Sequence, residues 1–222
     1  MKRLLISVCL LLFNVITLLA QINVRGINIT DMKGKPLMNN SVSEVQGSVY
    51  YKEEYFNAKL YLIDGQEITD IKIKLNLRDN IVNYVNNEGA EMEAVSKIKR
   101  ILFTETGDIF ESGFPAVNKQ DNQTFYRVII SGKASLLLFT NFVESDFKAF
   151  NSAITTKQID KVIEIFGVSP NAISLLTQSE DVLQLLKDKN KEVYNYIITN
   201  HLKCKKQSDF EKIIKYYNTL IN

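Results

Sequence analysis

The sequence predicts an α+β fold, in which an antiparallel β meander, arranged as a sandwich or a barrel-like sheet, is followed by a short C-terminal helical segment. Three observations predict this class. Apolar and polar residues alternate with the two-residue period of half-buried strands through much of residues 56–142. Turn-forming residues separate these runs at short intervals, as in all-β meanders. From residue 178 the apolar residues recur instead with the period of an amphipathic helix.

The N-terminus has the composition of a secretory signal peptide. Lys2 and Arg3 are followed by an apolar run that ends at Ala20, and the polar sequence begins at Gln21. A charged end before a short apolar helix is typical of segments that enter the translocon. The run is shorter than the roughly 20 residues that a permanent span needs, although an uncleaved membrane anchor is the alternative. We expect cleavage after Ala20 and an exported protein that is periplasmic or associated with the cell envelope.

Charge and cysteine content exclude several function classes. The chain of 222 residues has 27 basic and 25 acidic residues, and two of the basic residues lie in the leader. The remaining chain is therefore formally neutral, whereas a nucleic-acid-binding protein normally carries a basic excess. Cys204 is the only cysteine beyond the leader, so no intramolecular disulfide can form. We expect no nucleic-acid partner. Contact with a membrane surface stays open, but no membrane-spanning segment is expected after cleavage.

The clearest predicted hairpin lies at residues 56–77. Apolar residues occupy alternate positions of residues 56–62 and again of residues 71–77. The dipeptide Asp64-Gly65 lies between the two runs and suits a tight turn, because both of its positions tolerate positive φ. These features predict two antiparallel strands with one buried face each.

Further strands are predicted as far as residue 142. Gly132-Lys133 forms the turn of a later hairpin, and the apolar run from Leu136 to Phe139 indicates a strand that is covered on both sides. Runs of strand character occupy residues 81–85, 90–96, 98–104, 109–113, 124–131 and 134–142.

The segment that follows is less regular. Residues 143–160 have no clear period, and the structure of residues 143–172 as a whole stays open. One interpretation is a last hairpin of residues 161–166 and 173–177, with Pro170 in its loop.

Residues 178–222 are predicted to be helical and to pack on the β domain. Ser208 and Glu211 have the spacing of a capping box at the start of the last helix. The apolar stripe of that helix comprises Phe210, Ile213, Ile214, Tyr217, Leu220 and Ile221. The chain is therefore divided into a signal peptide (1–20), an antiparallel β-rich domain (21–177) and a helical C-terminal segment (178–222).

These features together resemble a family of uncharacterised exported bacterial proteins with a β-rich domain and a helical C-terminus. The resemblance rests on the Asp64-Gly65 hairpin, the Gly132-Lys133 hairpin and the closing run Lys212-Ile213-Ile214-Lys215-Tyr216-Tyr217-Asn218. It covers most of the chain beyond the leader. It implies a location in the envelope, in the periplasm of a Gram-negative cell, and it supplies no activity, cofactor or site residue.

Groups suited to catalysis are sparse in the sequence. His201 and Cys204 are spaced to share one side of a helix, as a nucleophile and its base would. Two ligands of these types do not make a structural zinc site, which normally takes four. Carboxylate pairs of the kind that glycosidases and oxygen-ligand metal sites use occur at Glu53-Glu54, Glu91 and Glu93, and Glu180-Asp181. A solvent-facing loop explains the spacing of His201 and Cys204 better, and solvated faces explain the carboxylate pairs. We therefore assign no catalytic, cofactor-binding or metal-ligating residue.

Two features suit a binding protein better. Lys203, Lys205 and Lys206 form a basic cluster, and Tyr50, Tyr51, Tyr55 and Phe56 form an aromatic group before the first strong strand. Both patterns also fit an ordinary solvated loop and ordinary core packing. The leading hypothesis is a non-catalytic envelope protein that binds another protein or a cell-surface component. The alternatives are a carrier of an apolar, lipid-like ligand in a β cavity and a carboxylate-dependent hydrolase.

Overall fold

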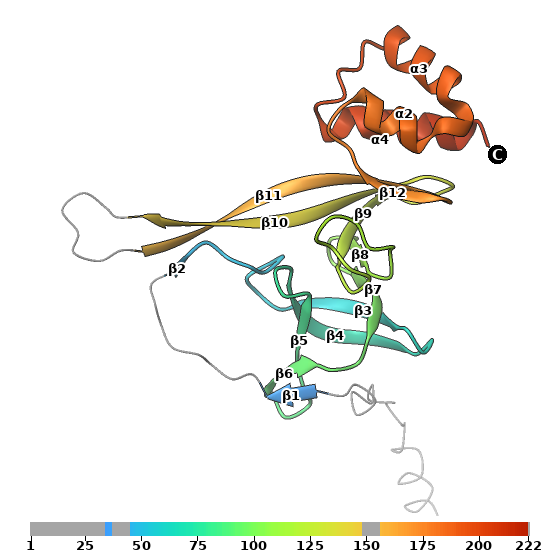
Figure 1. Ribbon diagram of the computed structural model, residues 1–222. Coiled ribbons are helices and arrows are strands. Elements are labelled where there is room, and N and C mark those ends of the chain that lie inside the picture. Colours follow the sequence, from blue (N-terminus) through green and yellow to red (C-terminus); the bar gives the residue numbers. More distant parts are fainter. Residues whose placement is uncertain (1–33, 37–44, 148–155, 222) are drawn as a thin grey trace, which may run out of the picture.

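The computed structural model describes residues 34–36, 45–147 and 156–221, and it confirms the α+β class (Figure 1). The described strands form one sheet in the order β1-β6-β5-β4-β3-β7-β8-β9-β10-β11-β12, an open path that does not close on itself. Most neighbours are antiparallel, as expected of a meander, while β2 pairs in parallel with the outer side of β11. The strands are β1 (Gly34–Pro36), β2 (Val45–Gln46), β3 (Phe56–Leu62), β4 (Glu67–Asn76), β5 (Ile81–Val85), β6 (Glu91–Ala94), β7 (Ile98–Phe103), β8 (Ile109–Glu111), β9 (Tyr126–Ile130), β10 (Ser135–Phe147), β11 (Thr156–Ser169) and β12 (Ala172–Leu175).

The predicted hairpin of β3 and β4 is confirmed. The two strands pair from Phe56 opposite Ile73 to Tyr61 opposite Glu67. Gly65 has a φ of 91°, a conformation that glycine adopts at little cost, and its N–H donates to the Leu62 carbonyl oxygen across the turn (3.2 Å). The alternation therefore fixes which face of each strand is buried, and the turn fixes the register.

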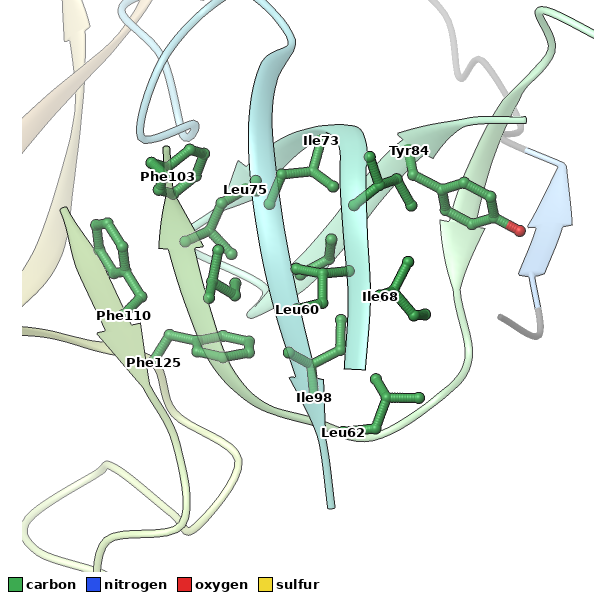
Figure 2. Close-up of a cluster of buried hydrophobic side chains, with 14 of the residues drawn as sticks. Leu60, Leu62, Ile68, Ile73, Leu75, Tyr84, Ile98, Phe103, Phe110 and Phe125 are labelled. Atoms are coloured by element: carbon green, nitrogen blue, oxygen red, sulfur yellow. The ribbon is translucent and has the colours of Figure 1, made fainter. Parts of the chain in front are cut away.

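The inward faces of β3, β4, β5, β7 and β8 enclose the first hydrophobic core (Figure 2). From Ile71 to Leu75, alternate residues of β4 are buried, as the two-residue period predicts. Between Ile68 and Ile71 the alternation is broken, because the pairing with β3 shifts its register there and Asp70 has a φ of 55°. The labelled members of this core are Leu60, Leu62, Ile68, Ile73, Leu75, Tyr84, Ile98, Phe103, Phe110 and Phe125.

The strands β10 and β11 form a long hairpin that the sequence predicted only in part. They pair without a register shift from Ser135 opposite Val168 to Phe147 opposite Thr156. In Figure 1 this hairpin extends well beyond the end of β9. Many side chains in its outer part are solvent-exposed, so the half-buried alternation is missing there. A hairpin of β11 and β12 is present around Pro170, but its strands differ from the expected ones. Residues 166–169 pair with residues 172–175, so the turn is tighter than expected, and residues 161–164 pair with β10 instead.

Burial on both faces of β10 is also confirmed. Leu136 belongs to a core shared with the C-terminal helices. Its neighbour Leu137 packs on the opposite face, together with Tyr126 and Phe166. Because successive side chains point to opposite faces of a strand, the apolar run joins two separate cores.

The C-terminal segment consists of α2 (Ser179–Leu185), the short 3-10 helix η2 (Lys187–Lys189), α3 (Asn190–Thr199) and α4 (Gln207–Thr219). The helices lie together over one face of the β9–β12 part of the sheet (Figure 1). Phe210, Ile213, Ile214 and Tyr217 of the predicted stripe are buried, and Leu220 and Ile221 are half-buried. Each such burial stabilises the fold by roughly 1.5–3 kcal/mol.

The predicted capping box at the start of α4 is wrong. The helix begins at Gln207 with Lys206 as its N-cap, so Ser208 lies inside the first turn. The Gln207 side chain instead donates to the Glu211 carboxylate at 2.8 Å. A side-chain cap of this kind is present at α2, where the Asp181 carboxylate accepts hydrogen bonds from the backbone N–H groups of Thr177 (2.8 Å) and Gln178 (3.1 Å).

The leader and its predicted cleavage site at Ala20 lie outside the described residues. Within the described part of the chain, no helix combines the length and the apolar character that crossing a membrane requires.

Candidate functional site

A groove lies at one end of the hydrophobic core of the first half. A hollow of about 270 Å³ opens where the turn before β5, the connection between β6 and β7 and the loop after β8 meet. Val82, Ile98 and Phe125 contribute apolar side chains to it, and all three are almost completely buried. Figure 2 shows Ile98 and Phe125 together at one end of the core cluster. The hollow therefore gives access from solvent to the edge of the core.

A second hollow of about 550 Å³ adjoins the first. The two share Ile63, Val95, Ser96 and Lys97, and we call them together the Val95 groove. Ile63 and Val95 are 59% and 55% exposed, which is unusual for two apolar side chains beside one groove. Single exposed apolar residues need no explanation, whereas apolar residues grouped beside a hollow are typical of binding sites.

Hydrogen bonds of backbone N–H groups hold the walls of the Val95 groove in place. The N–H of Ile63 donates to the Lys97 carbonyl oxygen at 3.0 Å, which ties the end of β3 to the β6–β7 connection. On the opposite wall, the N–H of Phe125 donates to Oδ1 of Asn80 at 2.8 Å. Asn80 has a φ of 55°, which Asn tolerates better than most residues. The groove is thus supported on both sides by strand ends rather than by one loop alone.

The polar side chains of the Val95 groove comprise one ammonium group, two carboxylates (Asp64 and Asp79), and amide and hydroxyl groups. Lys97 is exposed and is the one cation among the lining residues. The Ser112 hydroxyl donates to the Ile98 carbonyl oxygen at 2.8 Å and is therefore already engaged. The Asp79 carboxylate accepts from the Asn76 side chain at 2.8 Å. The groove offers a ligand apolar contacts, hydrogen-bonding side chains, one ammonium group and two carboxylates.

A partly buried charge cluster lies outside the groove, where three segments meet. The Asp108 carboxylate accepts hydrogen bonds from the Tyr51 hydroxyl and from the Arg127 guanidinium group, which also forms its ion pair. Burial alone would raise the pKa of Asp108, but hydrogen bonds from Tyr51 and Thr106 and the charge of Arg127 together lower it. Burial, followed by the contact with Asp108, raises the pKa of Tyr51. The cluster joins the segment before β3 and the β7–β8 turn to β9, which is a structural role.

His201 and Cys204 do not form the pair that their spacing allowed. His201 is exposed, whereas Cys204 is fully buried in the core between the helices and the sheet. Burial raises the pKa of the Cys204 thiol, and nearby Asp209 and Glu180 act in the same direction. A thiol in such surroundings is a poor nucleophile.

The three carboxylate pairs are dispersed among structural contacts. Glu53 lies 3.9 Å from the Lys74 ammonium group. Glu91 lies beside Tyr55, whose pKa is raised to about 12, chiefly by burial and then by that negative charge. Asp181 caps α2 as described above. The structure does not bring these pairs together into one site.

The aromatic group and the lysine cluster, which suggested binding in the sequence, lie in different parts of the structure. Tyr51 packs against Phe103 and Phe110 at ring-centroid distances of 5.0 and 4.7 Å, so it belongs to the first core. The ammonium group of Lys74 lies 4.1 Å from the centre of the Tyr50 ring. Lys203, Lys205 and Lys206 are exposed in the connection between α3 and α4.

Sequence reasoning did not identify the Val95 groove. A weak signal was present, because Ile63 and Val95 each follow an apolar or small residue at the end of a strand. Two such residues in succession must point to opposite faces, so one of them faces outward. Comparison with protein-family models, with curated proteins and with solved structures finds no match to this chain.

Proposed function

We propose that this chain is a non-catalytic exported protein of the cell envelope that binds another protein or a cell-surface component, with the Val95 groove as its contact surface. The observation that carries the proposal is the pairing of two exposed apolar side chains, Ile63 and Val95, with a hollow that reaches the core. A partner segment would place an apolar side chain between them and an acidic group near Lys97.

Other features favour this reading over its alternatives. The interior of the first half is filled by packed side chains, and the described strands form an open path, so a lipid-like ligand has less support. A hydrolase has less support as well, because the pairs Glu53-Glu54, Glu91 and Glu93, and Glu180-Asp181 lie in separate places, and Glu53, Glu91 and Asp181 each have their own structural contact.

Site-specific photo-cross-linking in the native cell tests the proposal. A photoreactive residue replaces Val95 in one variant and Glu88, in the exposed turn between β5 and β6, in the control. We expect one discrete cross-linked species at position 95, none at position 88, and loss of the species when Lys97→Glu is added. The same product from both positions, or a product that Lys97→Glu leaves unchanged, would rule out the groove as the contact surface.

A further inference from the structure

The outer edge of β11 has an open stretch between two strands that pair with it. On one side β2 pairs with Lys157 and Gln158, and on the other side β12 pairs from Phe166 onward. The Leu176 N–H also donates to the Ile165 carbonyl oxygen at 2.7 Å. The edge between these contacts faces solvent over a few residues.

The backbone groups on this stretch can be assigned from the alternation of the strand. Because alternate residues direct their N–H and C=O groups to opposite sides, Lys161 and Ile163 direct theirs to the same outer side as Ile165. Within the described part of the chain, neither backbone has a hydrogen-bond partner on that side. Lys161 and Ile163 together offer two N–H and two C=O groups to an added extended segment.

The end of β2 keeps this stretch open. Gly47 follows β2 with a φ of 94°, and a Cβ atom at this position would clash with the Ile159 carbonyl oxygen. Glycine therefore lets the chain lie close to β11 and then turn away from its edge. The open edge thus follows from a defined turn in the chain.

The side chains beside the open edge have a simple pattern. Asp160, Val162 and Glu164 lie on one face of β11, because they occupy alternate positions, and Val162 is 45% exposed. Gln158 donates to Asp160 and Asn141 donates to Glu164, both at 3.0 Å. No cation of the described residues forms an ion pair with either carboxylate. The face presents an acidic, an apolar and a second acidic side chain in succession.

We propose that this edge of β11 accepts an extended segment of another protein in which a cationic, an apolar and a second cationic residue alternate. Antiparallel addition would place the three side chains opposite Glu164, Val162 and Asp160, where opposite charges and apolar contact both favour pairing. Val143 on β10, 48% exposed and diagonal to Val162, extends the apolar contact on the same face.

A second copy of this chain fits the edge poorly. Twofold pairing centred on Val162 would set Asp160 opposite Glu164, and pairing centred on Lys161 would oppose two lysines. Pairing centred on Ile163 would need the carbonyl oxygen of Ile165, which Leu176 already occupies. The same charges that select a basic partner therefore discourage self-association, a common protection of exposed sheet edges.

The proposal is tested with a blocked peptide, Lys-Thr-Val-Thr-Lys, which spans only positions 160–164, titrated into the isotope-labelled chain as purified from expressing cells. We expect saturable changes in the amide resonances of Lys161 and Ile163 and an affinity that falls with salt. A peptide with both lysines replaced by glutamate should bind about tenfold more weakly, since two exposed ion pairs contribute a few-fold each. In the double variant Asp160→Lys/Glu164→Lys the preference should invert.

A backbone variant separates strand addition from simple charge attraction. Ile163→Pro removes an N–H group that points away from β10, so we expect an unchanged melting temperature and loss of peptide binding. If Ile163→Pro does not fold, the preference of the Asp160→Lys/Glu164→Lys variant for the two peptides still tests the proposal. Equal binding of both peptides, an unchanged preference in the exchanged variant, or a dimer in sedimentation that Ile163→Pro disrupts would overturn the proposal. These outcomes are independent of the cross-links at Val95.

Discussion

The contact between Asn218 and Ala134 makes the C-terminal helix an integral part of the fold, and it can be perturbed almost without changing its shape. The Asn218 side chain, on α4, accepts from the Ala134 N–H at 2.8 Å and donates to the Ala134 carbonyl oxygen at 2.9 Å. Ala134 is fully buried just after the Gly132-Lys133 turn. The substitution Asn218→Asp keeps the acceptor but replaces the donor with a carboxylate oxygen.

The expected loss of stability follows from the two oxygen atoms that the substitution leaves facing each other. A lost hydrogen bond that leaves a buried carbonyl oxygen unsatisfied costs about 1–3 kcal/mol. The new carboxylate also faces that oxygen, so Asn218→Asp should reduce the free energy of unfolding by about 2–4 kcal/mol at neutral pH. For a domain of this size the melting temperature should fall by roughly 5–15 °C.

The loss of stability should depend on pH with a definite sign. Partial burial and the facing carbonyl raise the pKa of the introduced carboxyl group in the folded state, and its protonated form can again donate to Ala134. The folded variant then binds more protons than the unfolded chain, so its stability rises as the pH falls from 7 toward 4, relative to the unmodified chain.

Urea unfolding at pH 4 and pH 7 provides the measurement. The matched control is Asn195→Asp, at an exposed position of α3, which should change the stability by no more than about 0.5 kcal/mol. If Asn218→Asp behaves like this control at pH 7, the contact contributes nothing and α4 is held by apolar packing alone.

Three further expectations concern the core, the charge cluster and the leader. Ile214→Ala should reduce the free energy of unfolding in urea by about 2–5 kcal/mol, because the Ile214 side chain is fully buried in the core between the helices and the sheet. A loss no larger than that of Lys215→Ala, at an exposed position of the same helix, would contradict this packing. The pKa of Asp108 is lowered in the folded state, so this group contributes stability that is present above its ordinary pKa of 3.8 and is lost as the pH falls below that value. Asp108→Asn should therefore lower the urea midpoint at pH 7 and make the loss of stability in acid less steep. An unchanged dependence of stability on acid pH would speak against the cluster. Mass spectrometry of the native protein should place its N-terminus at or near Gln21, and recovery of the intact leader from membranes would exclude cleavage.

The parts of the fold that follow from local periodicity were predictable. The β3–β4 hairpin and the stripe of α4 each bury one regular face, so their residues alternate or recur as the geometry demands. The outer part of the β10–β11 hairpin was not predictable in this way, because strands that are solvated on both faces have no apolar period. The Val95 groove was not predictable either. Its walls come from segments that are apart in the sequence and that meet only through the pairing register of the sheet.

The contact between Asn218 and Ala134 also has a consequence for the time course of folding. The two residues are 84 positions apart, and chains are synthesised N-terminus first at roughly 5–20 residues per second. The apolar surface around Leu136 that α4 covers therefore emerges roughly 4–17 s before its cover is complete. During that interval the apolar residues of β9 and β10 have no cover from α4, which makes the nascent chain prone to aggregation and a natural client for a chaperone until its last helix has been made.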